Sequence, residues 1–248
     1  ELIIGEILSD GKLQNRKVVP QTLYSCSKDY LFNLDWNEDT KNIDICFEKD
    51  TKPLGEIGDI SFGIMTGDDS KFTYKERLHP NEDKKVLRGG NIKKYSLLWK
   101  GEYVWYNPNV MKKHKDTARP AEPQRFENEK IIIKREGAGT ITATIDLDNY
   151  YTIGSTFIIN KKNNSFDLKY LLGLLNSKLL NYWYSQRYKT ITQSINSYQK
   201  IPIHLASEKE QQKIIVLVDK ILDLNKKLVV FGDKQTSETK KLKDEIEK

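Results

Sequence analysis

Two stretches of this sequence combine clustered cations with side chains that can form hydrogen bonds to nucleic-acid bases. Residues 88–135 hold 12 Lys and Arg against 5 Asp and Glu, and residues 168–204 hold five cations and no carboxylate. Residues 1–83 have the opposite balance, with 17 Asp and Glu against 10 Lys and Arg. Clustered cations release counterions from a phosphate backbone, so this distribution favours a polyanionic partner. A Lys-rich composition that only keeps the protein in solution explains the charge alone equally well.

Three patterns with a bearing on catalysis are incomplete. Asn107-Pro108-Asn109 lacks the second Pro and the aromatic residue of the loop that holds a flipped base in amino-methyltransferases, and we interpret it as a turn. The segment Gly63–Gly67 is shorter than a phosphate-binding loop, and the acidic pair Asp68-Asp69 follows it. Asp69-Ser70-Lys71 fits part of a Mg²⁺ nuclease pattern, but such triplets arise by chance in a chain that is 31% charged. We therefore predict no catalytic residue.

The cysteines and histidines give no sign of a metal centre. Cys26 and Cys46 are the only cysteines, and the three histidines lie far apart in the sequence. We therefore predict neither a metal site nor a disulfide framework, and a reducing, cytoplasmic setting fits best. No stretch approaches the ~18 apolar residues of a membrane span. Because the first residues include no Met and no signal peptide, we expect a fragment of a longer polypeptide.

The apolar spacing up to about residue 160 is mostly that of strands. Residues 43–47 alternate and look extended. Residues 131–133 and 140–145 flank a Gly-rich turn and predict a hairpin, with Ile141, Ala143 and Ile145 on one face. Residues 154–159 supply another strand.

From Asp167 onward the spacing becomes helical. Apolar residues recur at three- and four-residue steps as far as Trp183, which predicts one helix with a buried face. Ser207 and Glu210 have the spacing of a capping box, and Ile214 to Leu228 follow a heptad seam that packs on a partner helix or on its own domain. We expect an α+β fold: a mixed, largely antiparallel β domain followed by amphipathic helices and a C-terminal helical arm.

Several segments, in order, follow the pattern of a single family. The segments are Leu54–Gly67, Val86–Tyr95 with Asn91 where Asp is more usual, Arg119-Pro120 before Lys130–Arg135, Tyr170–Lys178, and Ile201-Pro202-Ile203 before Glu210–Ile214. Together they resemble the TaqI-like C-terminal specificity (target-recognition) domain of type IIG restriction–modification enzymes and adenine-specific DNA methyltransferases. They are similar as well to the recognition domains of type I specificity subunits.

The resemblance implies sequence-specific recognition of double-stranded DNA without chemistry in this fragment. It implies a methyltransferase domain N-terminal to it in the same polypeptide and, in some members, a nuclease. S-adenosylmethionine and Mg²⁺ would then belong to those parts, and we expect no cofactor here. Residues 1–52 would be the connector, residues 53–205 the recognition domain, and residues 206–248 the helical arm.

DNA contacts are expected from cations and polar side chains in or near the two basic stretches, although each cation alone also fits an ordinary surface position. The predicted contacts are Lys71, Arg88, Asn91, Lys93, Lys94, Lys112, Lys113, Arg119, Lys134, Arg135, Arg187, Lys189, Thr192, Gln193 and Ser194. Three other functions remain open: half of a type I specificity subunit, a protein-interaction module with an incidental basic surface, and a free-standing nuclease.

Overall fold

The computed structural model describes residues 2–22, 38–162, 166–231 and 236–247. A four-stranded sheet lies at its centre, in the order β11-β10-β13-β4, with every neighbouring pair antiparallel. Its strands are β4 (Gly58–Phe62), β10 (Lys130–Lys134), β11 (Ala143–Asp146) and β13 (Thr156–Lys161). The predicted α+β class and the predicted hairpin are confirmed, with Ile131 opposite Ile145.

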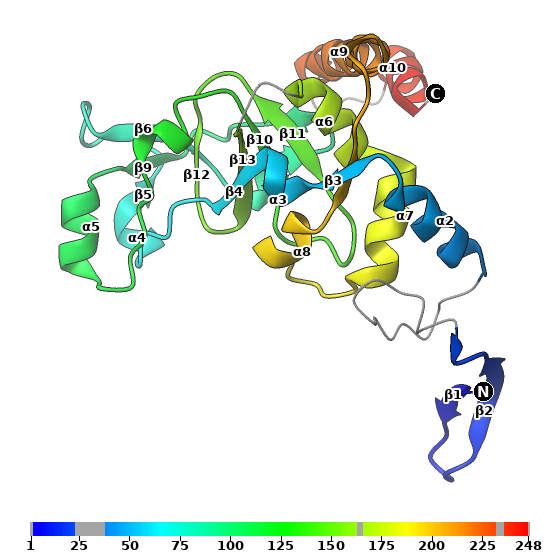
Figure 1. Cartoon of the computed structure of the whole chain (residues 1–248). Coiled ribbons are helices and arrows are strands. Elements are labelled where there is room, and N and C mark those ends of the chain that lie inside the picture. Colours follow the sequence, from blue (N-terminus) through cyan, green and yellow to red (C-terminus); the bar gives the residue numbers. More distant parts are fainter. Residues whose placement is uncertain (1, 23–37, 163–165, 232–235, 248) are drawn as a thin grey trace.

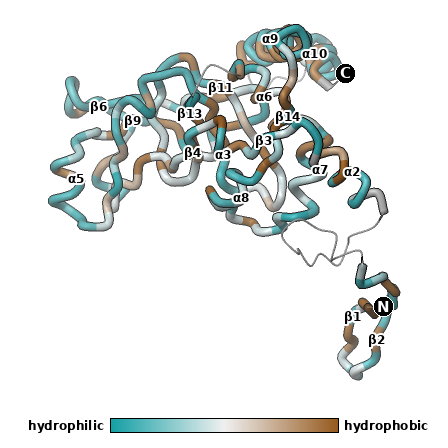
Figure 2. The backbone as a smooth tube through the Cα atoms, viewed as in Figure 1, coloured by the Kyte–Doolittle hydropathy of each residue, from teal (hydrophilic) through white to brown (hydrophobic). Residues whose placement is uncertain are grey.

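The central sheet is buried on both faces. Ile131 and Ile159 point into the cluster formed with the helices, whereas Ile132 and Ile158 point into the clusters on the opposite side. Even Thr144, between the apolar positions of β11, is only 1% exposed. The alternation in sequence therefore does not mark a solvent face. Figure 2 shows hydrophobic stretches along these central strands.

A second sheet covers one of these faces, in the order β12-β6-β9-β5. Its strands are β5 (Thr73–Tyr74), β6 (Asp83–Leu87), β9 (Tyr103–Trp105) and β12 (Tyr151–Thr152), and β12 runs parallel to β6. Two short helices, α4 (Asp69–Phe72) and α5 (Pro108–His114), close this end of the molecule (Figure 1).

The start of α5 corrects the turn expected at Asn107-Pro108-Asn109. The Asn107 side chain accepts a hydrogen bond from the Val110 amide at 3.1 Å, and Pro108 occupies the first helical position. An Asn cap followed by Pro is a strong start signal, because the cap satisfies an amide that the first turn leaves free.

The helices lie against the other face of the central sheet and at its far end (Figure 1). They are α6 (Leu168–Asn176), α7 (Lys178–Arg187), α8 (Ile195–Gln199), α9 (Glu208–Phe231) and α10 (Ser237–Glu247). The single helix expected from Asp167 to Trp183 is in fact two. Ser177 adopts an extended conformation, and its hydroxyl accepts from the Leu180 amide at 3.1 Å to begin α7.

The predicted heptad seam of α9 is largely covered, since Ile214 packs against the core shared with α6 and Leu224 is 7% exposed. Leu217 is the exception at 60% exposed, whereas Val218 beside it is 2% exposed. Gly173 of α6 permits this close packing, because a Cβ there would lie 2.7 Å from Ile214 Cγ2 and 3.1 Å from Val218 Cγ2. As predicted, the Glu210 carboxylate reaches back to the Ser207 amide, at 2.9 Å.

Another expectation fails near the N-terminus. Residues 43–47, expected to be extended, lie within helix α2 (Glu38–Glu48). Trp183, whose spacing favoured the core, is 7% exposed, as expected.

The remaining elements are β1 (Leu2–Ile7), β2 (Leu13–Val19), β3 (Thr51–Pro53), α3 (Leu54–Ile57), η1 (Gly89–Asn91), β7 (Ile92–Lys93), β8 (Ser96–Leu97), η2 (Pro123–Arg125) and β14 (Pro202–His204).

Candidate nucleic-acid interface

Predicted contacts from both basic stretches lie along one line of loops at the strand ends. Met65 and Arg119 exchange backbone hydrogen bonds at 2.7 and 2.9 Å. Gly154 lies beside Met65, since a Cβ on this glycine would be 3.7 Å from Met65 Cγ. The guanidinium of Arg135 donates to the Gly154 carbonyl at 3.4 Å, and its plane lies over the ring of Phe62. We call the line from Arg119 through Met65 and Gly154 to Arg135 the loop strip.

Exposed cations continue the loop strip at the α5 end. Lys112 and Lys113 occupy the last turn of α5, where their charge also stabilises the negative end of the helix dipole. Lys115 follows, and its ammonium donates to the Gly67 carbonyl at 2.9 Å. Gly67 has a φ of +79°, which lets the loop turn back toward this lysine. The structure thus places the predicted contacts Lys112, Lys113 and Arg119 together at this end of the strip.

A histidine joins α4 to α5 beside these lysines. His114 Nε2 lies 3.1 Å from Asp68 Oδ2, and His114 Nδ1 lies 3.1 Å from the ammonium of Lys71. Lys71 can only donate, so this contact makes Nδ1 the acceptor and places the ring proton on Nε2. Hydrogen bonds from the Ser70 hydroxyl and from His114 lower the pKa of Asp68 to about 2. Lys71 is thus held in place at the end of the strip, and His114 was not singled out from the sequence.

The other end of the strip is residues 188–194, which we call the clamped loop. Gln193 is 2% exposed, and its backbone amide donates to the Arg135 carbonyl at 3.2 Å. Its side-chain amide donates to the Thr140 carbonyl at 3.1 Å, and its side-chain oxygen accepts from the hydroxyl of Tyr198. Gln193 was predicted to contact DNA, but here its hydrogen bonds hold the clamped loop against the rest of the protein. Thr192 and Ser194 beside it are exposed, as a contact requires.

Three other predicted contacts have side chains occupied within the protein. Arg187 forms an ion pair with Asp44 of α2, and its side chain is 11% exposed. Arg88 binds Glu102 at 2.7 Å and Asp69 at 2.9 Å. Each of these two guanidinium groups therefore has a carboxylate beside it that would oppose its binding to a polyanion.

Asn91 is the third, at 8% exposed. It accepts from the Arg88 amide at 2.6 Å and donates to the Leu98 carbonyl at 2.9 Å. The resemblance placed Asn91 where Asp is usual, and either side chain can accept this amide hydrogen bond. Asn91, Arg88 and Arg187 are thus better explained as structural residues.

Lys93 and Lys94 lie away from the loop strip, on β7 and next to it. The Lys94 ammonium donates to the Asn176 carbonyl at 3.2 Å, at the C-terminal end of α6. A cation there satisfies a carbonyl that has no partner within the helix. Lys134 lies next to the strip, since it directly precedes Arg135 and pairs with Thr156 of β13. The predicted contacts that the structure brings together are thus Lys71, Lys112, Lys113, Arg119, Lys134, Arg135, Lys189, Thr192 and Ser194.

The incomplete catalytic patterns have structural roles. Asp69, from the nuclease-like triplet, accepts from the Thr66 hydroxyl at 2.6 Å and pairs with Arg88. Within the described ranges, no group of three or more His, Cys, Asp or Glu is placed to hold a metal ion. In those ranges, too, no helix is long and apolar enough to cross a membrane.

Comparison with known proteins agrees with the resemblance noted in the sequence. Residues 84–204 match the TaqI-like C-terminal specificity domain. That match spans just under half of the 248 residues and includes β6, the central strands β10, β11 and β13, and the clamped loop. No curated protein sequence matches the chain.

Three solved structures are among those similar to the chain. The type IIL restriction–modification enzyme MmeI, solved in complex with DNA, aligns with a TM-score of 0.52 and 12% identity over 79% of this chain and 32% of its own. The HsdS subunit from Thermoanaerobacter tengcongensis aligns at 0.47 and 15% identity, over 84% of this chain and 50% of that one. The type I S subunit from M. genitalium aligns at 0.42 and 15% identity, over 91% and 49%. The chain therefore spans about a third to a half of the length of these proteins.

Proposed function

We propose that this chain, whose residues 84–204 match a TaqI-like specificity domain, recognises a sequence in double-stranded DNA for a restriction–modification system. The observation that carries the proposal is the loop strip within and beside that domain, with exposed cations at its α5 end and exposed hydroxyl side chains at the clamped loop. Contacts to phosphates carry no sequence information, whereas side-chain contacts to base edges distinguish bases. A surface that presents both kinds of group on loops held by a rigid sheet is suited to binding DNA and to distinguishing its bases.

A specificity domain fits a chain without a catalytic centre of its own, so the chemistry would come from elsewhere. In our proposal an adenine-N6 methyltransferase, with or without a nuclease, lies in the same polypeptide N-terminal to residue 1. S-adenosylmethionine and Mg²⁺ would bind to those catalytic parts, and the whole would act on DNA in the cytoplasm.

Salt-dependent binding to DNA tests the proposal. The chain is titrated onto a fluorescent duplex of random sequence at several salt concentrations. A variant with Lys112, Lys113, Arg119 and Lys189 all changed to Gln should bind at least about tenfold more weakly at 100 mM salt. Its plot of log affinity against log salt should be shallower by about 3 to 4, because each lost phosphate contact removes about 0.9 from the slope.

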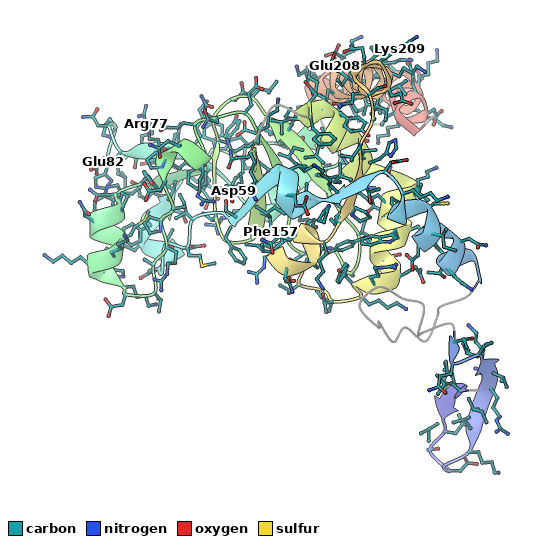
Figure 3. The ribbon with its side chains drawn as sticks, viewed as in Figure 1. Asp59, Arg77, Glu82, Phe157, Glu208 and Lys209 are labelled. Atoms are coloured by element: carbon teal, nitrogen blue, oxygen red, sulfur yellow. The ribbon has the colours of Figure 1, made fainter. Side chains whose placement is uncertain are left out.

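Four lysines of α9 provide the matched control. Lys209, Lys213, Lys226 and Lys227 are exposed, and α9 lies at the opposite end of the molecule from α5 (Figures 1 and 3). Changing these four to Gln removes the same charge from a different surface. If this control variant loses as much affinity as the first, or if the unchanged chain binds no duplex at low salt, the proposal is wrong.

The reading frame that surrounds the chain separates two forms of the proposal. An Asn-Pro-Pro-aromatic loop encoded upstream would identify a methyltransferase fused to this domain. A second copy of the whole segment pattern would instead identify the chain as half of a type I specificity subunit.

A further inference from the structure

The clamped loop presents one large apolar side chain to solvent. Ile191 is 73% exposed, although it lies between residues that are tied to the protein. A single exposed apolar residue is common on protein surfaces and needs no explanation alone. The setting of Ile191 is different, because its own carbonyl and the two residues that follow it are bonded to the protein.

Main-chain and side-chain bonds fasten the loop to the tip of the β10–β11 hairpin. The Ile191 carbonyl accepts from the Gly137 amide at 3.2 Å, and Thr192 forms a β-bridge with Glu136. The buried Gln193 adds its three hydrogen bonds, to Arg135, Thr140 and Tyr198. These bonds hold Ile191 in one place before any partner binds, which lowers the entropy cost of a contact.

Glycines allow the hairpin tip to come this close. A Cβ on Gly139, whose φ is +82°, would lie 3.0 Å from the Tyr188 carbonyl oxygen. A Cβ on Gly137 would lie 3.3 Å from the side-chain nitrogen of Gln193 and 2.4 Å from the Thr140 carbonyl oxygen. The tip and the clamped loop are therefore one packed unit, and Ile191 projects from it.

The groups around Ile191 favour a nucleic-acid groove over a protein surface. Lys189, Thr190 and Thr192 are exposed beside it, and residues 168–204 contain no carboxylate. The bridge to Thr192 brings one acidic residue close, the exposed Glu136. A carboxylate repels phosphates but accepts from the amino group of cytosine in the major groove. Glu136 thus disfavours a phosphate next to Thr192 and can accept from a base edge, whereas Lys189 can bind a phosphate beside it.

We propose that Ile191 reads the 5-methyl group of a thymine in the major groove. This inference rests on the DNA-recognition function proposed above. The thymine methyl is the one apolar group that a base pair exposes in that groove, and apolar side chains contact it. An isoleucine held in place among hydroxyl groups and a lysine provides the matching surface.

Removal of that methyl group from the DNA gives the test. The full chain first selects its binding sequence from a random duplex library. Each thymine of the selected site is then replaced, one at a time, by uracil, which lacks only the methyl. At one position the replacement should weaken binding about fourfold, the factor that corresponds to one buried carbon. Ile191→Ala should bind the thymine and uracil duplexes equally, and Ile191→Val should keep most of the discrimination.

Leu217→Ala serves as the control, because Leu217 is a similarly exposed apolar residue on the distant helix α9. It should keep the full preference for thymine. If Ile191→Ala discriminates as the unchanged chain does, or if no thymine of the site is sensitive to uracil, the reading by Ile191 is wrong while DNA recognition stands. If the unchanged chain selects no sequence at all, the proposed function fails, and this inference fails with it.

Discussion

Replacing Lys130 with Met removes one half of an ion pair whose two side chains are fully buried. The Lys130 ammonium lies 2.5 Å from the Asp146 carboxylate, and both side chains are 0% exposed. The ammonium also donates to the Phe126 carbonyl at 2.5 Å. Asp146 accepts in turn from the amides of Asp148 and Tyr150, each at 2.9 Å. The pair therefore joins the start of the β10–β11 hairpin to the loops on either side.

The cost of Lys130→Met follows from the charge left behind. Removing one partner of a buried ion pair costs about 3–5 kcal/mol, because the other charge stays buried without compensation. Two backbone amides still bind Asp146 in the variant, so we expect the lower part of that range, about 3 kcal/mol. For a chain of this length, each kcal/mol lowers the melting temperature by about 2–4 °C. The variant should therefore melt about 6–12 °C below the unchanged chain.

Thermal and urea unfolding, followed by circular dichroism, measure this difference. Lys84→Met is the matched control, because Lys84 pairs with Glu127 at 3.6 Å with both side chains partly exposed. Such a pair contributes about 0–1 kcal/mol. Adding Asp146→Asn to Lys130→Met removes the stranded charge and should restore most of the loss. If Lys130→Met unfolds within about 1 kcal/mol of Lys84→Met, the buried pair does not stabilise the fold as argued.

Three further predictions concern the loops and caps. Gly63→Ala should lower the free energy of unfolding in urea by about 1–3 kcal/mol, because its new Cβ would lie 2.4 Å from the Ile153 carbonyl oxygen. A Cβ at Gly90 would meet open space, so Gly90→Ala should change this free energy little. Asn107→Ala should cost about 1 kcal/mol through loss of the α5 cap, and an unchanged urea midpoint would contradict that role. The pKa of Asp68 in the folded chain is about 2, below the usual 3.8. The stabilising contribution of this carboxylate is therefore complete above about pH 4 and is lost as the pH falls to 2. The urea midpoints of Asp68→Asn and of the unchanged chain should differ at pH 6 and converge near pH 2.

The sequence predicts the central hairpin well, because both of its strands are long apolar runs around a turn. It misleads at residues 43–47, since alternation over five residues does not exclude a helix. Ile43 and Phe47 are four residues apart and pack together on the core, while Ile45 on the opposite side of α2 is 46% exposed. A short run of this kind fits both periods, and only the packing partner decides.

Capping residues were also harder to place than apolar ones. Ser177 lies within a continuous run of helical spacing, and nothing in that spacing shows that the chain turns there. Its hydroxyl begins α7, and the apolar faces of α6 and α7 still meet the same core. The sequence therefore gives the buried face correctly and the helix boundaries incorrectly.

The candidate site could be only partly predicted, because charge along the chain does not show where a side chain finds its partner. Arg187 looks free in a stretch without carboxylates, yet Asp44 of α2 folds back onto it. Arg88 likewise meets Glu102 across the second sheet. The loop strip depends on loops near residues 65, 119, 135 and 154 meeting at the ends of strands, which no local pattern shows.

The contact at Gly173 has a consequence for how such a molecule can be adapted. It lies in the first half of α9, and the helix continues for 13 residues beyond Val218 to Phe231, roughly 20 Å at 1.5 Å per residue. A larger residue at position 173 would tilt the helix about this point, and a few degrees of tilt move its far end by about an ångström. The angle of α9 and the position of the loop strip thus depend on separate parts of the chain. One side-chain volume at position 173 can change the angle of α9 while the loop strip stays unchanged.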